Sequence, residues 1–269
     1  MAPVTYHRDV RPLLTGMSYH QEIDRAVMLA RRAVSAANLE EPGPLTRFLY
    51  QHWYLGRGSD ATVPRQVAAR DTAERSPRLT PATPPWRTWG PHWNDDRECH
   101  GADLVRLFLA CAPHTALHAV AAVTAHAQQW EHPWLLTSRA LGQAVPSADS
   151  TVLYLPAESL DDLHDHVEAM LTDIRPFLAT TVPALTLRVG RGASLAQNPA
   201  DGRPFGQHRC SLVAGTVLAN RGAPHGKLVD EVRETFRRAG VDPQRPYRAL
   251  GSEWQWARQP RATRTTVAA

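Results

Sequence analysis

Lysine is nearly absent from this sequence of 269 residues, which holds 29 arginines and the single lysine Lys227. A mechanism that needs an amine base therefore has one candidate, because arginine stays protonated in proteins. Lys227 starts an amphipathic pattern, so we expect it to face water and to be a poor base. The net charge of +4 favours an acidic or phosphorylated partner, although an arginine-rich composition explains it equally well. No basic stripe with interleaved aromatics indicates nucleic-acid binding.

Cysteines and long apolar runs are also scarce. The three cysteines are an odd number and lack C-x-x-C spacing, which argues against a disulfide framework and a structural zinc site. No run of 18 apolar residues appears, and residues 1–8 lack the apolar core of a signal peptide. We therefore expect a cytoplasmic protein that does not insert into membranes.

Several catalytic signatures are missing as well. No phosphate loop of the type G-x-x-x-x-G-K-[ST] and no G-x-S-x-G motif is present, which removes the simplest arguments for a nucleotide-binding protein or a serine hydrolase. His114 and His118 are four residues apart, and His164 and His166 flank an aspartate, but no third ligand follows at a fixed spacing. We expect neither a metal nor a cofactor.

Periodicity predicts an α+β fold, in which a helical N-terminal part precedes a mixed or antiparallel sheet with packed helices. The predicted helices are residues 20–38, 45–55, 114–130, 159–174 and 227–239, and a left-handed cap is expected at Gly240. The predicted strands are residues 104–109, 135–136, 151–155 and 185–189, and residues 210–220 fit either a buried helix or a strand. The Pro42-Gly43-Pro44 sequence is expected to break the chain between the first two helices.

Composition divides the chain into four segments. Residues 1–56 form the helical N-terminal part, and residues 57–89, which are rich in Arg, Thr, Ser and Pro, form an irregular loop. Residues 90–256 form the α+β domain, and residues 257–269 form a flexible tail.

The most informative motif is residues 203–214, which place Arg203, His208 and Arg209 at the head of an apolar run. Arginine matches phosphate or carboxylate with a fixed fork of donors, and histidine exchanges a proton near neutral pH. These residues therefore suit chemistry on a phosphorylated substrate. An ordinary surface turn before a core segment is the alternative.

Together with residues 45–54, 105–109, 132–137 and 148–155, this motif resembles the HopA-type effector family. That family includes type III secretion effectors and the lyases of class V lanthipeptide and thioamitide biosynthesis, and it is distantly similar to the phosphothreonine lyases. The resemblance implies a phosphothreonine-lyase-like fold. It also implies elimination of phosphate from phosphoserine or phosphothreonine in a ribosomally made precursor peptide, with a kinase-like partner. Such a lyase needs a base, an acid and a cationic clamp.

Not every family residue carries over. Arg106 keeps the clamp role, whereas Phe108 stands where the family has its acid histidine and Thr137 where it has its base lysine. Ser147 stands where the family often has an arginine. The resemblance and the motif together predict His208 as the catalytic residue and Arg106, Arg203 and Arg209 as phosphate-binding residues.

Three hypotheses follow. The hypothesis we favour is that the protein is a carbon–oxygen lyase whose site is rebuilt around a histidine. Alternatively, the protein is a pseudo-lyase that binds the precursor peptide or the partner kinase as a scaffold. An effector that acts on host proteins is the third, and the lack of a Ser-rich N-terminus weighs against it. Convergence of Arg106, Arg209 and a histidine on one concave surface would favour the lyase.

Overall fold

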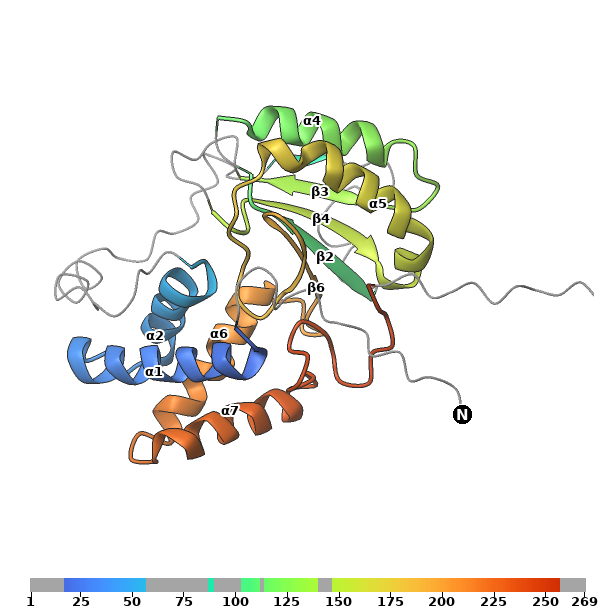
Figure 1. Cartoon of the computed structure of the whole chain (residues 1–269). Coiled ribbons are helices and arrows are strands. Elements are labelled where there is room, and N and C mark those ends of the chain that lie inside the picture. The colour runs from blue at the N-terminus through green and yellow to red at the C-terminus, as the bar shows by residue number, and fades with distance from the viewer. Residues whose placement is uncertain (1–16, 57–86, 90–102, 112–113, 140–146, 257–269) are drawn as a thin grey trace, which may run out of the picture.

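The computed structural model describes residues 17–56, 87–89, 103–111, 114–139 and 147–256. Within them the chain has an α+β fold, in which helices cover both faces of one antiparallel sheet (Figure 1). The predicted fold class is confirmed. Most of the predicted irregular loop and the predicted tail lie outside the described residues.

The sheet has six strands in the order β1-β3-β4-β2-β6-β5, and every neighbouring pair is antiparallel. The strands are β1 (Arg87–Trp89), β2 (Leu104–Leu109), β3 (Leu135–Ser138), β4 (Thr151–Pro156), β5 (Leu187–Gly190) and β6 (Ala193–Gln197). All residues of β2 are buried, because its alternating side chains face two covered sides. The prediction that the irregular loop extends to residue 89 is wrong, because Arg87–Trp89 pair with β3.

Helices α4 (Ala116–Ala127) and α5 (Leu160–Ile174) lie side by side on one face of the sheet (Figure 1). Val105, Leu107 and Leu109 of β2 point into the apolar core beneath them. Short 3-10 turns, Ala157–Ser159 and Arg175–Phe177, flank α5. We call this side of the sheet the α4–α5 face.

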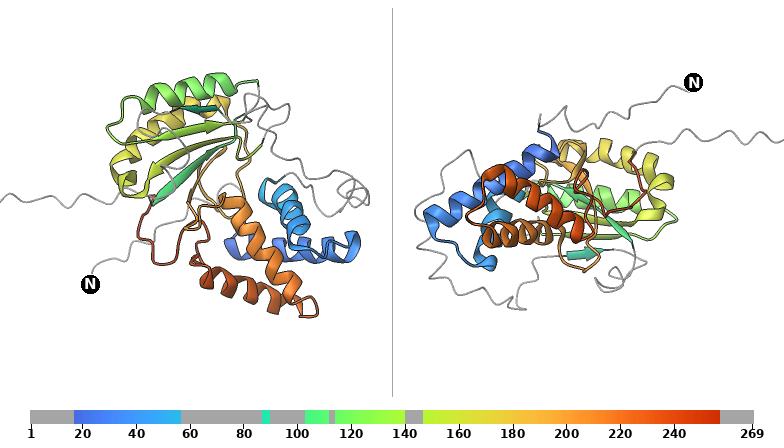
Figure 2. Two further views of the ribbon diagram at one scale, coloured as in Figure 1. Left: turned by 180° about the vertical axis from the view of Figure 1, so that it is seen from behind. Right: turned by 90° about the horizontal axis from the view of Figure 1, so that it is seen from below.

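The opposite face is covered by helices from both ends of the chain (Figure 2). They are α1 (Tyr19–Ala37), α2 (Pro42–Leu49) with its π-helical continuation η2 (Tyr50–Tyr54), α6 (Phe205–Ala219) and α7 (His225–Arg238). α6 contacts α1, α2 and α7, and Phe108 and Val152 of the sheet share one apolar core with these helices. We call this side the α6 face. No helix in the described ranges is long and apolar enough to cross a membrane.

Capping residues set the ends of helices α1 and α7, and a proline starts helix α2. α1 begins with a capping box between Ser18 and Gln21, and α7 ends before Gly240, whose φ of +72° confirms the predicted left-handed cap. The chain does break between the first two helices, but the break lies at residues 38–41, before Pro42. Pro42 is the first residue of α2, because proline lacks the N–H that the first helical turn leaves unpaired.

The Gly190-Arg191-Gly192 sequence contains the turn of the β5–β6 hairpin. Gly192 has a φ of +61°, and a Cβ atom there would lie 2.2 Å from the carbonyl oxygen of Ala179. Strand β6 was missed from the sequence, because Ala193–Gln197 contains no β-branched or aromatic residue.

Candidate functional site

The Arg203-to-Arg209 motif forms the start of α6, so the helix alternative for residues 210–220 is the correct one. Pro204 precedes the first turn in an extended conformation, and His208 and Arg209 are buried while Arg203 is exposed. Gly206 lies against Tyr54, and a Cβ atom there would be 2.3 Å from that ring. A glycine at this position allows α6 to approach η2 closely.

Arg209 is a buried cation with neutral partners. Its side chain is 2% exposed, its Nε donates to the carbonyl oxygen of Pro246 (3.0 Å), and its Nη1 donates to His208 Nδ1 (2.5 Å). The guanidinium also lies 4.5 Å above the ring of Phe205. No carboxylate of the described residues pairs with Arg209. Burial lowers the pKa of this guanidinium to about 9, so it remains charged at neutral pH.

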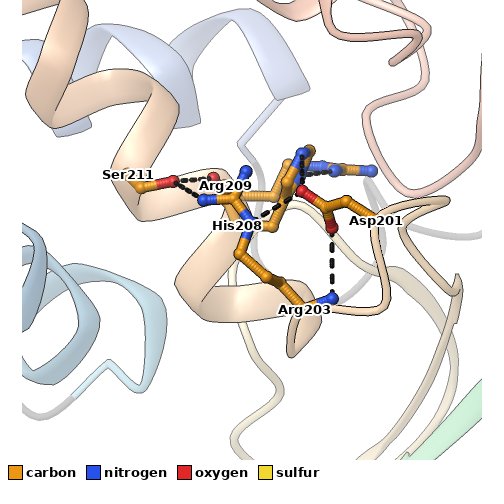
Figure 3. Close-up of polar contacts among 5 residues, drawn as sticks. All are labelled: Asp201, Arg203, His208, Arg209 and Ser211. Atoms are coloured by element: carbon orange, nitrogen blue, oxygen red, sulfur yellow. Dashed lines mark hydrogen bonds and ion pairs between the residues drawn. The ribbon is translucent and has the colours of Figure 1, made fainter.

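His208 is neutral at physiological pH. Burial, followed by the charge of Arg209, lowers its pKa to about 4, and the carboxylate of Asp201 opposes this shift. Since Nδ1 accepts from Arg209, we assign the ring proton to Nε2, which lies 3.6 Å from Asp201 Oδ2. Asp201 also accepts a hydrogen bond from Arg203 Nε (2.6 Å), so it stands between the exposed arginine and the buried histidine (Figure 3).

His208 and Arg209 line a cavity of about 360 Å³ beneath the loop that follows β6. Its other lining residues are Asp103, Gln197, Asn198, Pro199, Ala200, Ala239, Gly240, Val241 and Ala249. Arg209 is the only permanent cation among these described lining residues. Asp103, at the exposed rim, accepts a hydrogen bond from Gln197 Nε2 (2.6 Å). We call this space the Arg209 cavity.

Arg106 adjoins the Arg209 cavity through Asn198. Its Nε donates to Asn198 Oδ1 (2.7 Å), and its guanidinium lies 5.2 Å from the centre of the Tyr154 ring on the neighbouring strand. The side chain is 8% exposed, and its terminal nitrogens have no hydrogen-bond partner among the described residues. The structure therefore brings three predicted residues together. His208 and Arg209 line the cavity, and Arg106 lies behind Asn198, which is itself part of the lining.

Arg203 is separated from the other three predicted site residues. Its side chain is 49% exposed and lines a different cavity, on the far side of α6. Asn198, Tyr154 and Asp201 were not singled out from the sequence. Asn198 follows β6, which had no strand signal, and an aspartate before Gly-Arg-Pro is typical of any turn.

Phe108 and Thr137, which the sequence resemblance alone aligns with an acid and a base, cannot serve as either. Phe108 is buried against Phe205, with ring centres 6.1 Å apart. Thr137 is buried, and its hydroxyl has no hydrogen-bond partner in the described part of the chain. Lys227 is exposed at the start of α7, as predicted, and lines a separate surface depression.

A buried polar network lies on the same face of the sheet. The carboxylate of Asp149 is 3.0 Å from Arg139 Nη2, and it accepts hydrogen bonds from Ser147 (2.7 Å) and from the Tyr50 hydroxyl. Burial, and then the charge of Asp149, raise the pKa of Tyr50, so the phenol keeps its proton and donates it. This network ties η2 to the start of β4. Ser147, which the sequence resemblance alone aligns with an arginine, is part of it.

The histidines considered for metal binding form no such site within the described ranges, where no group of three or more His, Cys, Asp or Glu side chains is placed to hold a metal ion. His164 contacts Asp165 (3.2 Å) and stacks near Trp256. His118 packs against Phe177.

One sequence family and two solved structures are similar to this chain. The sequence model of the HopA1 effector protein family matches residues 92–248. The effector protein from Pseudomonas syringae pv. syringae strain 61 superposes with a TM-score of 0.51 at 14% identity, over 87% of this chain and 98% of that one. The effector protein from Pseudomonas syringae pv. tomato strain DC3000 gives a TM-score of 0.46 at 18% identity, over 67% and 71% of the two chains. No curated protein matches the sequence.

Proposed function

We propose that the chain, which belongs to the HopA1 effector protein family, binds the phosphate of a phosphorylated peptide in the Arg209 cavity and eliminates it as a carbon–oxygen lyase. The peptide would be a ribosomally made precursor, of the lanthipeptide or thioamitide type, whose serine or threonine has been phosphorylated by a kinase-like partner.

One observation carries this proposal: a guanidinium that is 98% buried lines a cavity and has no carboxylate partner among the described residues. A buried charge is costly unless an opposite charge compensates it. The carbonyl of Pro246 and the neutral ring of His208 supply hydrogen bonds but no negative charge. A phosphate dianion in the cavity would supply that charge and accept from Arg209, and Arg106 would add a second cation behind Asn198.

Elimination would need a proton to leave Cα, a bond to break and a proton to reach the leaving oxygen. His208 would take the Cα proton of the phosphorylated residue, the Cα electron pair would form the Cα–Cβ double bond, and the Cβ–O bond would break. The protonated His208 would pass its proton to the departing phosphate oxygen, so that hydrogen phosphate leaves, and Arg209 and Arg106 would stabilise its charge. In the unbound protein, Arg209 occupies the Nδ1 lone pair of His208. A bound phosphate would draw that donor away and, by its charge, raise the pKa of His208, so substrate binding would create the base.

Phosphopeptide binding without elimination is the second candidate. It is favoured by Phe108 and Thr137, which occupy the places of the family's acid and base, and by the pKa of about 4 that makes His208 a weak base before substrate binds. In this case the protein would hold the precursor peptide or the kinase-like partner as a scaffold.

The test incubates the purified chain with a phosphoserine peptide, a phosphothreonine peptide and their unphosphorylated forms, while peptide mass and binding are followed. We expect phosphate-dependent binding and loss of phosphoric acid. Arg209→Lys should weaken binding about ten-fold or more, since it removes the planar fork that matches phosphate. The matched control is Arg32→Gln, an exposed arginine of α1 outside both cavities.

The outcomes separate the candidates. Binding without loss of mass in the wild type supports the scaffold, and mass loss that His208→Gln abolishes while binding persists supports the lyase. Equal affinity for phosphorylated and plain peptides contradicts both. If Arg209→Lys fails to fold, the wild-type melting temperature in inorganic phosphate gives a second measurement, because a ligand that binds only the native state raises it.

A further inference from the structure

A second cavity lies between α2 and α6, on the opposite side of α6 from the Arg209 cavity. Its volume is about 460 Å³. It is lined by Pro42, Gly43, Thr46, Arg47, Tyr50, Gln51, Arg203, Gln207 and Ser211. Among the residues that the structure describes, the lining holds two arginines and no carboxylate. We call it the Arg47 cavity.

The two arginines differ in how they are held. Arg203 is fixed, since its Nε donates to Asp201 Oδ2 (2.6 Å) and its Nη1 donates to Ser211 Oγ (3.2 Å), as Figure 3 shows. Arg47 is exposed near the end of α2 and has no ion pair with any described residue. One preorganised and one available guanidinium therefore face the same space. Gln207 and Gln51 add neutral amide groups that can donate to a carboxylate, whereas the Thr46 hydroxyl already donates to the carbonyl oxygen of Pro42 (2.7 Å).

The first turn of α6 separates the two cavities. Gln207 and Ser211, four residues apart, lie on the side of the Arg47 cavity, whereas His208 and Arg209 lie on the other. Asp201 joins them, because its carboxylate pairs with Arg203 and lies 3.6 Å from His208 Nε2. A helix is about 10–12 Å across with its side chains, and an extended peptide covers about 3.3–3.6 Å per residue. A peptide that crosses the start of α6 would therefore reach from one cavity to the other with about three or four residues.

We propose that the Arg47 cavity binds an acidic side chain of the same peptide, three or four residues from the phosphorylated residue. This inference rests on the proposed phosphate binding in the Arg209 cavity. The two sites together would select a phosphorylated serine or threonine that has a glutamate or aspartate at this spacing, on one side of it.

The experiment uses the full chain and a series of fluorescent phosphoserine peptides in which one glutamate moves from four residues before the phosphoserine to four residues after it. Peptides with alanine in place of the glutamate, and all unphosphorylated counterparts, complete the series. Dissociation constants come from fluorescence anisotropy at low ionic strength. We expect glutamate at the matching position to tighten binding about two- to five-fold, the size of a partly exposed ion pair.

Substitutions show which arginine causes the preference for glutamate. Arg47→Gln should remove the preference for glutamate and leave the affinity for the alanine phosphopeptide unchanged, whereas Arg32→Gln should change neither. A glutamate effect that is equal at all positions, or that survives Arg47→Gln, overturns the inference. Phosphate dependence that Arg47→Gln removes and Arg209→Lys retains would place the phosphate in the Arg47 cavity, and would overturn both this inference and the proposed phosphate site.

The two proposals can fail separately. Position-dependent glutamate binding that needs Arg47, seen with both phosphorylated and plain peptides, supports the acidic subsite even if phosphate adds nothing. Phosphate-dependent binding without a glutamate preference leaves the proposed function standing and rejects the subsite.

Discussion

The two faces of the sheet are built from the same strands and contain different chemistry. On the α4–α5 face, β2 contributes Val105, Leu107 and Leu109 to a core of apolar side chains. On the α6 face, the same strand contributes Leu104, Arg106 and Phe108, and the helices add Arg209 and the network around Asp149. Alternation along β2 therefore places only apolar side chains of this strand on the α4–α5 face, whereas the α6 face combines an apolar core with buried charged groups. The buried charges on the α6 face carry a desolvation cost that an apolar core avoids.

The largest effect should come from truncating a buried side chain on the α4–α5 face, which leaves a cavity there. Leu107→Ala removes a fully buried side chain, and we expect a loss of about 2–5 kcal/mol in the free energy of unfolding, measured by urea denaturation. Leu117→Ala, at a side chain that is 65% exposed, should change it by less than about 0.5 kcal/mol. Phosphopeptide affinity of folded Leu107→Ala should equal that of the wild type. A weakened affinity would show that the faces are not separable.

The stability of the protein should depend on pH through the buried His208 of the α6 face. The pKa of His208 is lowered from about 6.5 to about 4 in the folded protein, so between these values the unfolded state binds more protons. Stability should fall as the pH drops from about 6.5 to 4, by at most about 3 kcal/mol. His208→Gln should flatten this part of the curve, whereas Leu117→Ala, at an exposed side chain that does not titrate, should not. A wild-type slope in His208→Gln would contradict the assignment.

Two glycines of α6 offer a matched pair. Gly206→Ala would place a methyl group against the buried Tyr54 ring, and we expect a cost of about 1–3 kcal/mol. Gly215→Ala, exposed in the same helix with nothing within 4 Å, should instead raise stability by about 0.5–1 kcal/mol, because alanine has the higher helix propensity. The difference between the two thermal midpoints measures the close contact of α6 with η2. Equal changes would mean that Tyr54 moves aside freely.

The sequence predicts the helices and strands of both faces better than the polar contacts of the α6 face, and the reason is physical. The helical periods of α1, α5 and α7 and the apolar runs of β2 and β4 are local patterns, which can be read along the chain. The environment of Arg209 depends on Pro246 and His208, and that of Arg106 depends on Asn198 and Tyr154. The partners contributed by residues 154, 198 and 246 are far away in sequence and carry no signal of their own.

Local signals also explain part of the site. Once residues 205–219 are known to be helical, the period of 3.6 residues sends Gln207 and Ser211 to one side and Arg209 to the other. Separation of Arg203 from Arg209 follows from the same step, because Arg203 precedes the helix. The choice between helix and strand for residues 210–220 was what left this division open.

The smallest effect should come from the contact that ties η2 to the start of β4. Tyr50→Phe removes the hydroxyl that donates to Asp149. The Asp149 carboxylate still contacts Ser147 and Arg139, so the free energy of unfolding should fall by only about 1–2 kcal/mol. A double-mutant cycle with Asp149→Asn, followed by chemical denaturation, measures the coupling directly. Because Tyr50 also lines the Arg47 cavity, its ring should still hold that wall, and Tyr50→Phe should retain the glutamate preference while it loses stability. Loss of the preference with stability unchanged would assign the hydroxyl to peptide binding instead of to the attachment of η2.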